Sequence, residues 1–388
     1  MIKTTFIHLL WSSYSLCLGV LIPKLMGAEI YGKLISDLSY AFLVVSVSQS
    51  LITFRLFSSV DQFDKKSLSI INFIVILFLS IIFIIFWFLG LFDLVYHWYS
   101  VLFIWSFVAV EIYKRILFHQ ANFNKIVFYE IIFRVFPLTY SLISITGFES
   151  LVLSLFIGNL LYVICTYFDF TRKYLNVIDL SNLLLNIKKF LKQGLYLLKF
   201  NIFSAMLTFY FIRLLNYNES IALIGVFFAL KNITAIVSPV LQWYESLLTR
   251  KMIHYKKDKI KLVLKWLFYG IIFLTLAFLF IWIIRSYIFE FLNIKLNEEN
   301  GYILLVLIIG ALIEFSNKPL TIYMRHYDLE KIIAKIGVYT FVIGLFIYPV
   351  FIILFDNDNY AIPLLIIQLI MFIFLLKSVI YENTTNRA

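Results

Sequence analysis

The sequence is dominated by long uninterrupted runs of apolar residues, each about as long as a helix that crosses a lipid bilayer. Such a helix needs roughly 20 consecutive and mostly apolar residues. Because the apolar positions do not alternate with polar ones, they predict helices and exclude a membrane β-barrel. Twelve predicted helices cover residues 4–23, 34–54, 69–91, 98–118, 126–147, 149–170, 194–216, 221–244, 263–285, 301–323, 333–355 and 361–381.

The composition excludes a set of ordinary soluble domains. Hydrophobic residues make up 62% of the 388 residues, and charged residues make up only 14%. A soluble domain has roughly 45–50% apolar and about 25% charged residues. So little polar surface could not cover such a large apolar core in water. We therefore predict an all-α polytopic membrane protein with about 12 transmembrane helices.

Lysine and arginine are distributed unequally between the two ends of the predicted helices. With the N-terminus placed in the cytoplasm, 24 of the 33 basic residues lie in or beside cytoplasmic loops. The opposite side holds only Lys24, Lys33, Arg285 and Lys295. Because cytoplasmic loops are enriched in Lys and Arg, this bias predicts a multi-pass protein with both termini in the cytoplasm. It also accounts for the net charge of +11 without a nucleic-acid partner.

The longest polar interruption lies at the middle of the chain and divides the predicted helices into two sets of six. It predicts an N-terminal lobe over 1–170, a cytoplasmic linker over 171–193 and a C-terminal lobe over 194–388. Apolar residues recur at helical spacing in the linker, which is typical of an amphipathic helix on the inner leaflet; a plain solvated linker is the alternative. The halves also correspond, since Gly32 and Gly225 take similar places in the second and eighth helices.

Several ionisable residues lie inside the predicted helices. Such a side chain costs about 2.5–3.5 kcal/mol on membrane-insertion scales, which makes each one a functional candidate. These residues are Asp37, Glu111, Glu130, Arg134, Lys199, Arg213, Lys231, Glu314 and Lys318.

Their positions favour different roles. Lys231 lies near the middle of its predicted helix, too far from an interface for its stem to reach water, so we expect it to face a lumen. Lys199, Arg213 and Asp37 lie near helix ends, where a simple interfacial role is an equal alternative.

Two acid–base pairs are spaced four residues apart and therefore share a helix face. They are Glu130 with Arg134 and Glu314 with Lys318. Each pair could bind together and stabilise the bundle, or could serve transport, and the sequence leaves both roles open. Glu111 stands apart, because it precedes basic residues that could neutralise it.

Motifs for catalysis and cofactors are absent from the sequence. It has no Gly-rich phosphate loop, no nucleophile with a His and an acid, and no metal-ligand spacing among its five histidines. Its two cysteines, Cys17 and Cys165, lie within apolar runs and indicate neither a disulfide nor a metal cluster. We therefore expect no enzyme, no cofactor and no bound metal.

Two local motifs and the overall plan resemble a known family. The turn over 23–32 places Lys24, Gly27 and Tyr31-Gly32 in a pattern similar to that family's basic-x-x-Gly-x-x-x-aromatic-Gly turn after the first helix. The segment 213–230, with its Ile-Gly-Val-Phe sequence, resembles the turn into the eighth helix. With twelve helices split six and six, the sequence resembles the MOP exporter superfamily, and more narrowly its polysaccharide-transporter branch of Wzx-type O-antigen and repeat-unit flippases.

This resemblance implies a V-shaped fold of two six-helix lobes in the bacterial inner membrane. It implies alternating access that moves an undecaprenyl-pyrophosphate-linked oligosaccharide to the outer leaflet, in lipopolysaccharide or other polysaccharide biosynthesis and alongside polymerase machinery. Because a bare diphosphate cannot cross hydrocarbon, basic groups in a central cavity are expected to hold it. The expected cargo-binding cations are Lys24, Arg55, Arg134, Lys199, Arg213, Lys231 and Lys318.

With no nucleotide site, the natural driving force is a proton or sodium gradient, worth about 2.3 kcal/mol per charge per 100 mV. The expected coupling carboxylates are Glu111, Glu314 and Asp37. One alternative is a multidrug or metabolite antiporter on the same fold, which needs an acidic or aromatic cavity. Another is a membrane glycosyltransferase or polymerase, which needs a large outer loop, whereas the longest one here covers only about 286–300.

Overall fold

A computed structural model describes most of the chain and is all-helical over the residues that it describes. These are residues 2–48, 102–103, 105–111, 123–144, 148–168, 199–217, 221–237, 240–241, 244–245, 247–248, 251–252, 259–327, 329–354 and 361–385.

Six elements of the N-terminal half carry labels. They are α1 (Ile2–Met26), α2 (Ala28–Ser48), α6 (Phe123–Glu130), the π-helical turn η2 (Ile131–Val135), α7 (Phe136–Ser144) and α8 (Phe148–Thr166). The C-terminal half begins with a helix over 199–217. It continues with α11 (Ile221–Thr234), the 3-10 turn η4 (Ala235–Val237), α13 (Lys259–Ile283), α14 (Arg285–Phe291), α15 (Glu298–His326), α16 (Glu330–Leu354) and α17 (Ile362–Thr385).

Six of the predicted transmembrane helices are confirmed within the described ranges as helices long and apolar enough to cross a membrane. They cover Phe123–Ser144, Glu149–Thr166, Lys259–Ile283, Glu298–His326, Glu330–Phe351 and Ile362–Tyr381. The predicted helix over 69–91 lies outside the described residues, and only part of 98–118 lies within them.

The predicted helix over 221–244 is wrong in its length. Helix α11 ends at Thr234 and passes into η4. The Thr234 hydroxyl donates to the backbone carbonyl of Lys231 at 2.7 Å, and Pro239 follows in the sequence. The regular α-helix therefore changes to a tighter 3-10 turn after Thr234. Lys231 therefore lies in the last turn of α11 and not at the middle of a long helix.

The chain divides into two compact units. Unit 1 comprises Met1–Tyr14 and Lys33–Ala205, and unit 2 comprises Ser15–Gly32 and Met206–Ala388. The first half of α1 thus belongs to unit 1 and its second half to unit 2. The predicted linker over 171–193 lies outside the described residues, so the predicted lobe boundaries remain predictions.

Unit 1 contains a closely packed group in which α8 lies against η2 and α7. Gly158 of α8 allows this approach, because a Cβ there would overlap the carbonyl oxygen of Phe133 and the ring of Pro137. The rings of Tyr129 and Tyr162 meet edge to face, with 5.6 Å between their centroids.

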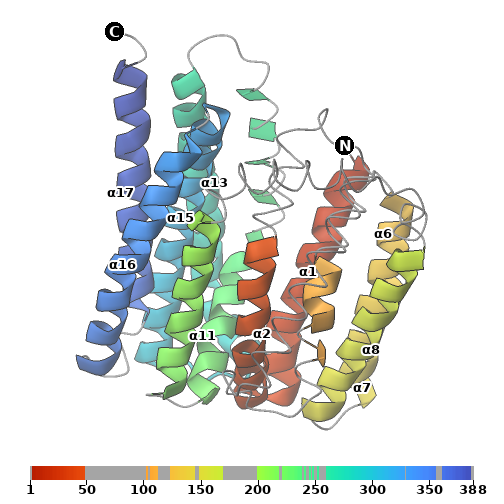
Figure 1. Cartoon of the computed structure of the whole chain (residues 1–388). Coiled ribbons are helices and arrows are strands. Elements are labelled where there is room, and N and C mark those ends of the chain that lie inside the picture. The colour runs from red at the N-terminus through yellow and green to blue at the C-terminus, as the bar shows by residue number, and fades with distance from the viewer. Residues whose placement is uncertain are drawn as a thin grey trace, which may run out of the picture. The chain divides into compact units, whose positions relative to one another are not determined.

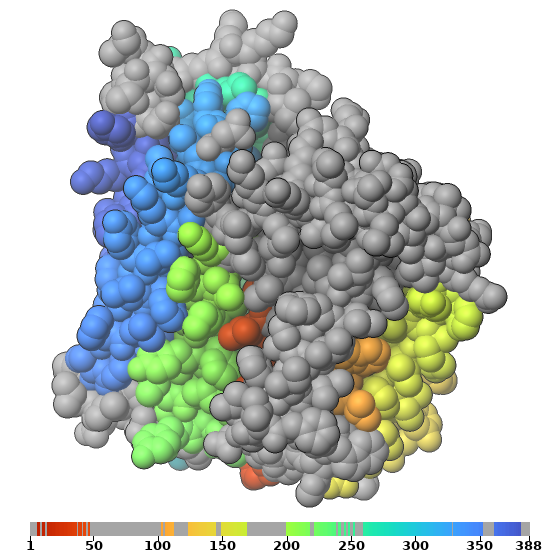
Figure 2. Space-filling model, in the orientation of Figure 1, coloured from red at the N-terminus to blue at the C-terminus, as the bar shows by residue number. Residues whose placement is uncertain are grey.

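The outer side of α8 carries an apolar stripe. Its exposed large residues recur at helical spacing, as Leu153, Ile157, Leu161 and Ile164. Figure 2 shows α8 at the surface in yellow. A continuous exposed apolar face on a helix of this length is suited to acyl chains and not to water.

Unit 2 is organised around α15. This helix packs against α13, α17 and α11, and α16 packs against α17 (Figure 1). The side chain of Asn297 caps α15 by accepting the backbone N–H of Asn300 at 2.9 Å. Acidic residues in the first turn of α15 and Arg325 and His326 in its last turn complement the helix dipole.

Two glycines bring the first turns of α2 and α11 together within unit 2. A Cβ on Gly32 would overlap the carbonyl oxygen of Ile221, and a Cβ on Gly225 would overlap the carbonyl oxygen of Ala28. Ala28 and Ile221 are the first residues of α2 and α11. The contact is therefore reciprocal, since each glycine meets the start of the other helix.

We expect Gly225→Ala to destabilise the protein. The added methyl group collides with backbone, which cannot rotate away, and overpacking of this kind costs about 1–3 kcal/mol. The measurement is the midpoint of thermal unfolding in detergent, which should fall by several degrees. Gly301→Ala is the matched control, because a Cβ there meets nothing within 4 Å. Equal midpoints for the two variants would contradict the close contact.

Candidate functional site

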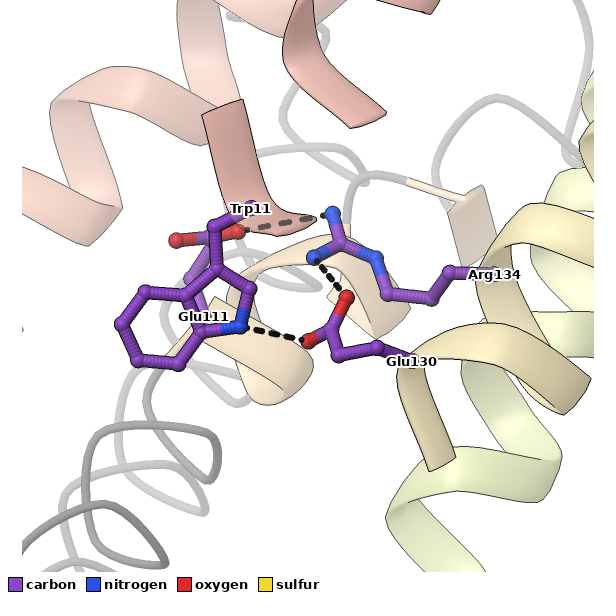
Figure 3. A network of polar contacts seen from close by, with 4 residues as sticks. All are labelled: Trp11, Glu111, Glu130 and Arg134. Carbon is purple, nitrogen blue, oxygen red and sulfur yellow. Dashed lines mark hydrogen bonds and ion pairs between the residues drawn. The ribbon is translucent and has the colours of Figure 1, made fainter. Parts of the chain in front are cut away.

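A buried network of charged side chains lies at the centre of unit 1 (Figure 3). Arg134 Nη1 donates to Glu130 Oε2 at 3.2 Å, and Arg134 Nη2 lies 3.4 Å from Glu111 Oε1. Trp11 Nε1 donates to the other oxygen of Glu130 at 3.1 Å. Both oxygens of Glu130 are therefore occupied, one by a guanidinium and one by an indole.

The surroundings of this network exclude water. The side chains of Arg134, Glu130 and Glu111 are 2%, 0% and 12% exposed. The guanidinium of Arg134 lies 4.0 Å from the centre of the Tyr14 ring, which adds a cation–π contact. Trp11 and Tyr14 thus join the first half of α1 to the network.

This network bears on the two roles left open for Glu130 and Arg134. The pair binds together, as the four-residue spacing predicts. The positive charge of Arg134 is balanced inside a closed cluster, which favours a role in holding the helices of unit 1 together. Glu111 takes Arg134 as a partner, whereas the expected neutralising residues Lys114 and Arg115 lie outside the described residues.

The second acid–base pair, in unit 2, takes other partners. Lys318 Nζ lies 2.8 Å from Glu245 Oε1 and pairs with that residue. Glu314 instead accepts a hydrogen bond from Gln368 Nε2 of α17 at 3.3 Å. Of the two roles left open for Glu314 and Lys318, mutual pairing is therefore not the one that the structure favours, because each residue contacts another segment of the chain.

Three of these polar groups remain open to the surroundings of unit 2. Glu314 is exposed, Lys318 is 44% exposed and Glu245 is 28% exposed. Glu314 lies near the middle of the 29-residue helix α15. An exposed charge at that depth would be costly against acyl chains, so this face of α15 is expected to meet water.

The other predicted cargo-binding cations contact aromatic rings or lie exposed. Lys24 Nζ lies 3.6 Å from the centre of the Phe291 ring, and Lys231 Nζ lies 5.5 Å from that of Phe228. Arg213 is half-buried, with its guanidinium 5.2 Å from the ring centre of its helix neighbour Phe209. Lys199 lies exposed at the start of the helix over 199–217.

Lys24 has a structural role in addition. Its backbone carbonyl accepts a hydrogen bond from Asn293 Nδ2 at 3.0 Å, which ties the end of α1 to the segment after α14. Asn293 has a positive φ of 55°, a conformation that Asn adopts more readily than most residues.

Lys231 differs from Arg134 and Lys318 in its electrostatic surroundings. It is half-buried, and no carboxylate among the described residues forms an ion pair with it. The neighbouring Asn232 donates a hydrogen bond to the hydroxyl of buried Tyr31. Asn232 thus fixes the last turn of α11 against α2, and Lys231 is carried on a rigid part of unit 2.

Two predicted site residues are not placed. Arg55 lies outside the described residues, and the side chain of Asp37 does as well, although its backbone belongs to α2. Across the described part of the chain, no group of three His, Cys, Asp or Glu residues could hold a metal ion.

Three site residues were missed by sequence reasoning. Gln368 interrupts the apolar run over 361–381, which is a signal that could have been used. Glu245 directly follows a predicted helix, so the sequence offered no reason to place it beside Lys318. Trp11 gave no signal, since an indole in an apolar helix is ordinary.

Known structures share the fold of this chain, although no protein-family model and no curated protein matches its sequence. An inward-facing MATE multidrug resistance transporter of the MOP superfamily aligns with a TM-score of 0.66 and 12% identity, covering 96% of this chain and 95% of its own. The lipid II flippase MurJ in an inward closed conformation aligns with a TM-score of 0.69 and 15% identity, covering 97% and 86%. A eukaryotic MATE transporter aligns with a TM-score of 0.63 and 12% identity, covering 98% of this chain and 94% of its own.

These likenesses show the fold of the chain. The chain is an all-α polytopic membrane protein with the fold of MOP-superfamily transporters, as the apolar runs and the local motifs predict. At such low identity the likeness establishes the fold, and the functional argument has to come from the residues of this chain.

We expect Arg134→Leu to destabilise the protein by about 3–5 kcal/mol, because it leaves Glu130 buried without its cation. Thermal unfolding in detergent measures the effect. The double variant Glu130→Gln with Arg134→Leu should regain part of the loss, since the fully buried carboxylate is then neutral and only Glu111, which is 12% exposed, loses the guanidinium.

Lys199→Met serves as the control, because Lys199 is exposed. Its unfolding midpoint should match that of the unchanged protein. An unchanged midpoint for Arg134→Leu would contradict the closed network.

Proposed function

We propose that this protein is a flippase that moves an undecaprenyl-diphosphate-linked oligosaccharide from the inner to the outer leaflet of the bacterial inner membrane. The observation that carries the proposal is the half-buried Lys231, without a carboxylate partner among the described residues, in a chain with a transporter fold. One solved structure with this fold is a lipid II flippase. Both termini would lie in the cytoplasm, as the distribution of basic residues predicts.

The chemistry of the cargo explains the need for unpaired cations. A diphosphate carries negative charges whose transfer into hydrocarbon is very costly. Ammonium and guanidinium groups in a wet lumen offset that cost through charge-assisted hydrogen bonds, while the lipid chain stays in the bilayer.

The cations divide into two groups on this proposal. Lys24, Arg55, Lys199, Arg213 and Lys231 remain the candidates that hold the diphosphate. Arg134 is not retained, because Glu130 and Glu111 balance its charge. Lys318 is paired with Glu245 and has lost most of its attraction for an anion.

The same fold also serves multidrug transporters, which keeps a multidrug or metabolite antiporter as the alternative. Such a protein would need an acidic or aromatic site for cationic compounds. Lys231 without an acidic partner disfavours this alternative, since it would repel a cationic drug. The proposed oligosaccharide would supply O-antigen or related polysaccharide synthesis and be consumed by polymerase machinery.

We expect Lys231→Met to reduce flipping of a fluorescent undecaprenyl-diphosphate disaccharide in proteoliposomes by at least tenfold. A charge-assisted hydrogen bond is worth about 1.5–3 kcal/mol, which corresponds to this factor or more. Quenching of the outer-leaflet label by dithionite gives the initial rate. Lys231→Arg should retain most of the activity, because it keeps the charge.

The matched control is Lys335→Met, which removes an exposed lysine of α16. It should flip the lipid at the normal rate. A normal rate for Lys231→Met would remove the support for an anionic cargo.

A proton or sodium gradient would drive the cycle, with Glu111, Glu314 and Asp37 as candidate coupling carboxylates. The structure places the side chains of Glu111 and Glu314. Glu314 is the more accessible carboxylate, since Glu111 is paired with Arg134. We expect Glu314→Gln to abolish the acceleration of flipping by an imposed gradient while binding of the bare undecaprenyl diphosphate survives; Glu111→Gln tests the other candidate in the same way. The rate with and without the gradient is the measurement, and full acceleration in a variant rejects that residue.

A further inference from the structure

The polar groups of α15 present a donor and an acceptor that are close together but not bonded to each other. Glu314 and Lys318 are one helical turn apart, a spacing that places their Cβ atoms roughly 5–6 Å from each other. Each is instead held by a different partner, Glu314 by Gln368 and Lys318 by Glu245. The carboxylate and the ammonium are thus fixed side by side, and both remain open to a ligand.

Gly310 helps to fix the Gln368 side of this arrangement. It lies one turn before Glu314 on α15, and a Cβ there would come within 2.8 Å of Gln368 Oε1. The absence of a side chain at Gly310 lets the amide of Gln368 lie close to α15. Gln368 is therefore a positioning residue for the Glu314 carboxylate.

The charges of this surface do not suit a diphosphate. Glu314 and Glu245 are matched by Lys318 and by Arg325, which interacts electrostatically with both Glu245 and Lys318, so these four charges sum to zero. A diphosphate finds no net positive charge here, and the ammonium of Lys318 beside Glu314 opposes a cationic ligand. A neutral ligand rich in hydroxyl groups fits best, because one hydroxyl can donate to Glu314 while it or its neighbour accepts from Lys318.

We propose that Glu314 and Lys318, positioned by Gln368 and Glu245, form a carbohydrate-binding surface that recognises the saccharide part of the cargo. This inference rests on the proposed function and assigns the sugar to α15 and α17, while the candidate cations named above hold the diphosphate. It changes the role first expected for Lys318 from an anion ligand to a hydroxyl ligand.

The proposal also gives Glu314 a means of coupling ion and cargo. Only the ionised carboxylate accepts a hydrogen bond from a sugar hydroxyl at both oxygens. A proton bound to Glu314 would therefore compete with the sugar for the same group.

The test compares lipids with and without sugar on the full-length protein in nanodiscs. The probes are undecaprenyl diphosphate alone and the same lipid bearing a single hexose, N-acetylhexosamine or deoxyhexose. Dissociation constants are measured by microscale thermophoresis. We expect the unchanged protein to bind at least one sugar-bearing lipid about five- to tenfold more tightly than the bare lipid, as one or two hydrogen bonds allow.

The variants separate sugar recognition from diphosphate binding. Lys318→Met and Gln368→Leu should abolish the preference for the sugar while leaving affinity for the bare lipid within about twofold. Lys231→Met should weaken the binding of every lipid by a common factor and so preserve the preference for the sugar-bearing lipid. Thr340→Val is the control for disturbed packing in unit 2, because its buried hydroxyl donates only to backbone carbonyls of α16; it should change neither quantity.

Three outcomes would overturn the inference. The unchanged protein could bind every lipid equally, or Lys318→Met could weaken bare and sugar-bearing lipids alike, which would make Lys318 an anion ligand after all. Both results leave the proposed function standing. If the unchanged protein does not bind bare undecaprenyl diphosphate, the proposed function itself fails, and this inference fails with it.

Discussion

The structure depends on the cost of placing a charge among acyl chains. Every ionisable side chain within the membrane must either find an opposite charge inside the protein or face water. Arg134 meets this constraint by pairing with Glu130 and Glu111 in a closed network. Glu314 and Lys318 meet it differently, since they stay exposed on one face of α15. The same constraint thus produces a structural site in unit 1 and an open polar surface in unit 2.

This difference separates residues that hold the fold from residues that can handle a ligand. The Arg134 network ties the first half of α1 to the helices of unit 1 through Trp11 and Tyr14. In unit 2, Lys231 stands on a helix fixed by the Gly32 and Gly225 contacts and keeps a charge without an acidic partner among the described residues. A cargo with a charged head and a neutral saccharide would require both kinds of open surface, one cationic and one hydrogen-bonding.

The sequence predicts the fold well because the length of each apolar run is set by one property, the thickness of the bilayer that the helix crosses. It predicts shared helix faces equally well, as for Glu130 and Arg134. It fails where a partner comes from another segment: spacing placed Glu314 beside Lys318, but Gln368 and Glu245 compete successfully for them. The sequence also placed Lys231 in the middle of a long helix. Hydropathy alone does not show that α11 ends at Thr234 and is followed by the 3-10 turn η4. Periodicity identifies the face of a helix, whereas tertiary contacts select the partner.

The most direct measurement of this account is the reactivity of single cysteines with a charged, membrane-impermeant thiol reagent. In a background with Cys17 and Cys165 replaced by serine, cysteine is introduced at Lys231, Glu314 and Ile157, the last on the outer apolar stripe of α8. The account predicts rapid labelling at 231 and 314 and none at 157, since only the first two meet water. Labelling at 314 as slow as at 157 would show that this face of α15 lies against lipid, and would contradict the central claim.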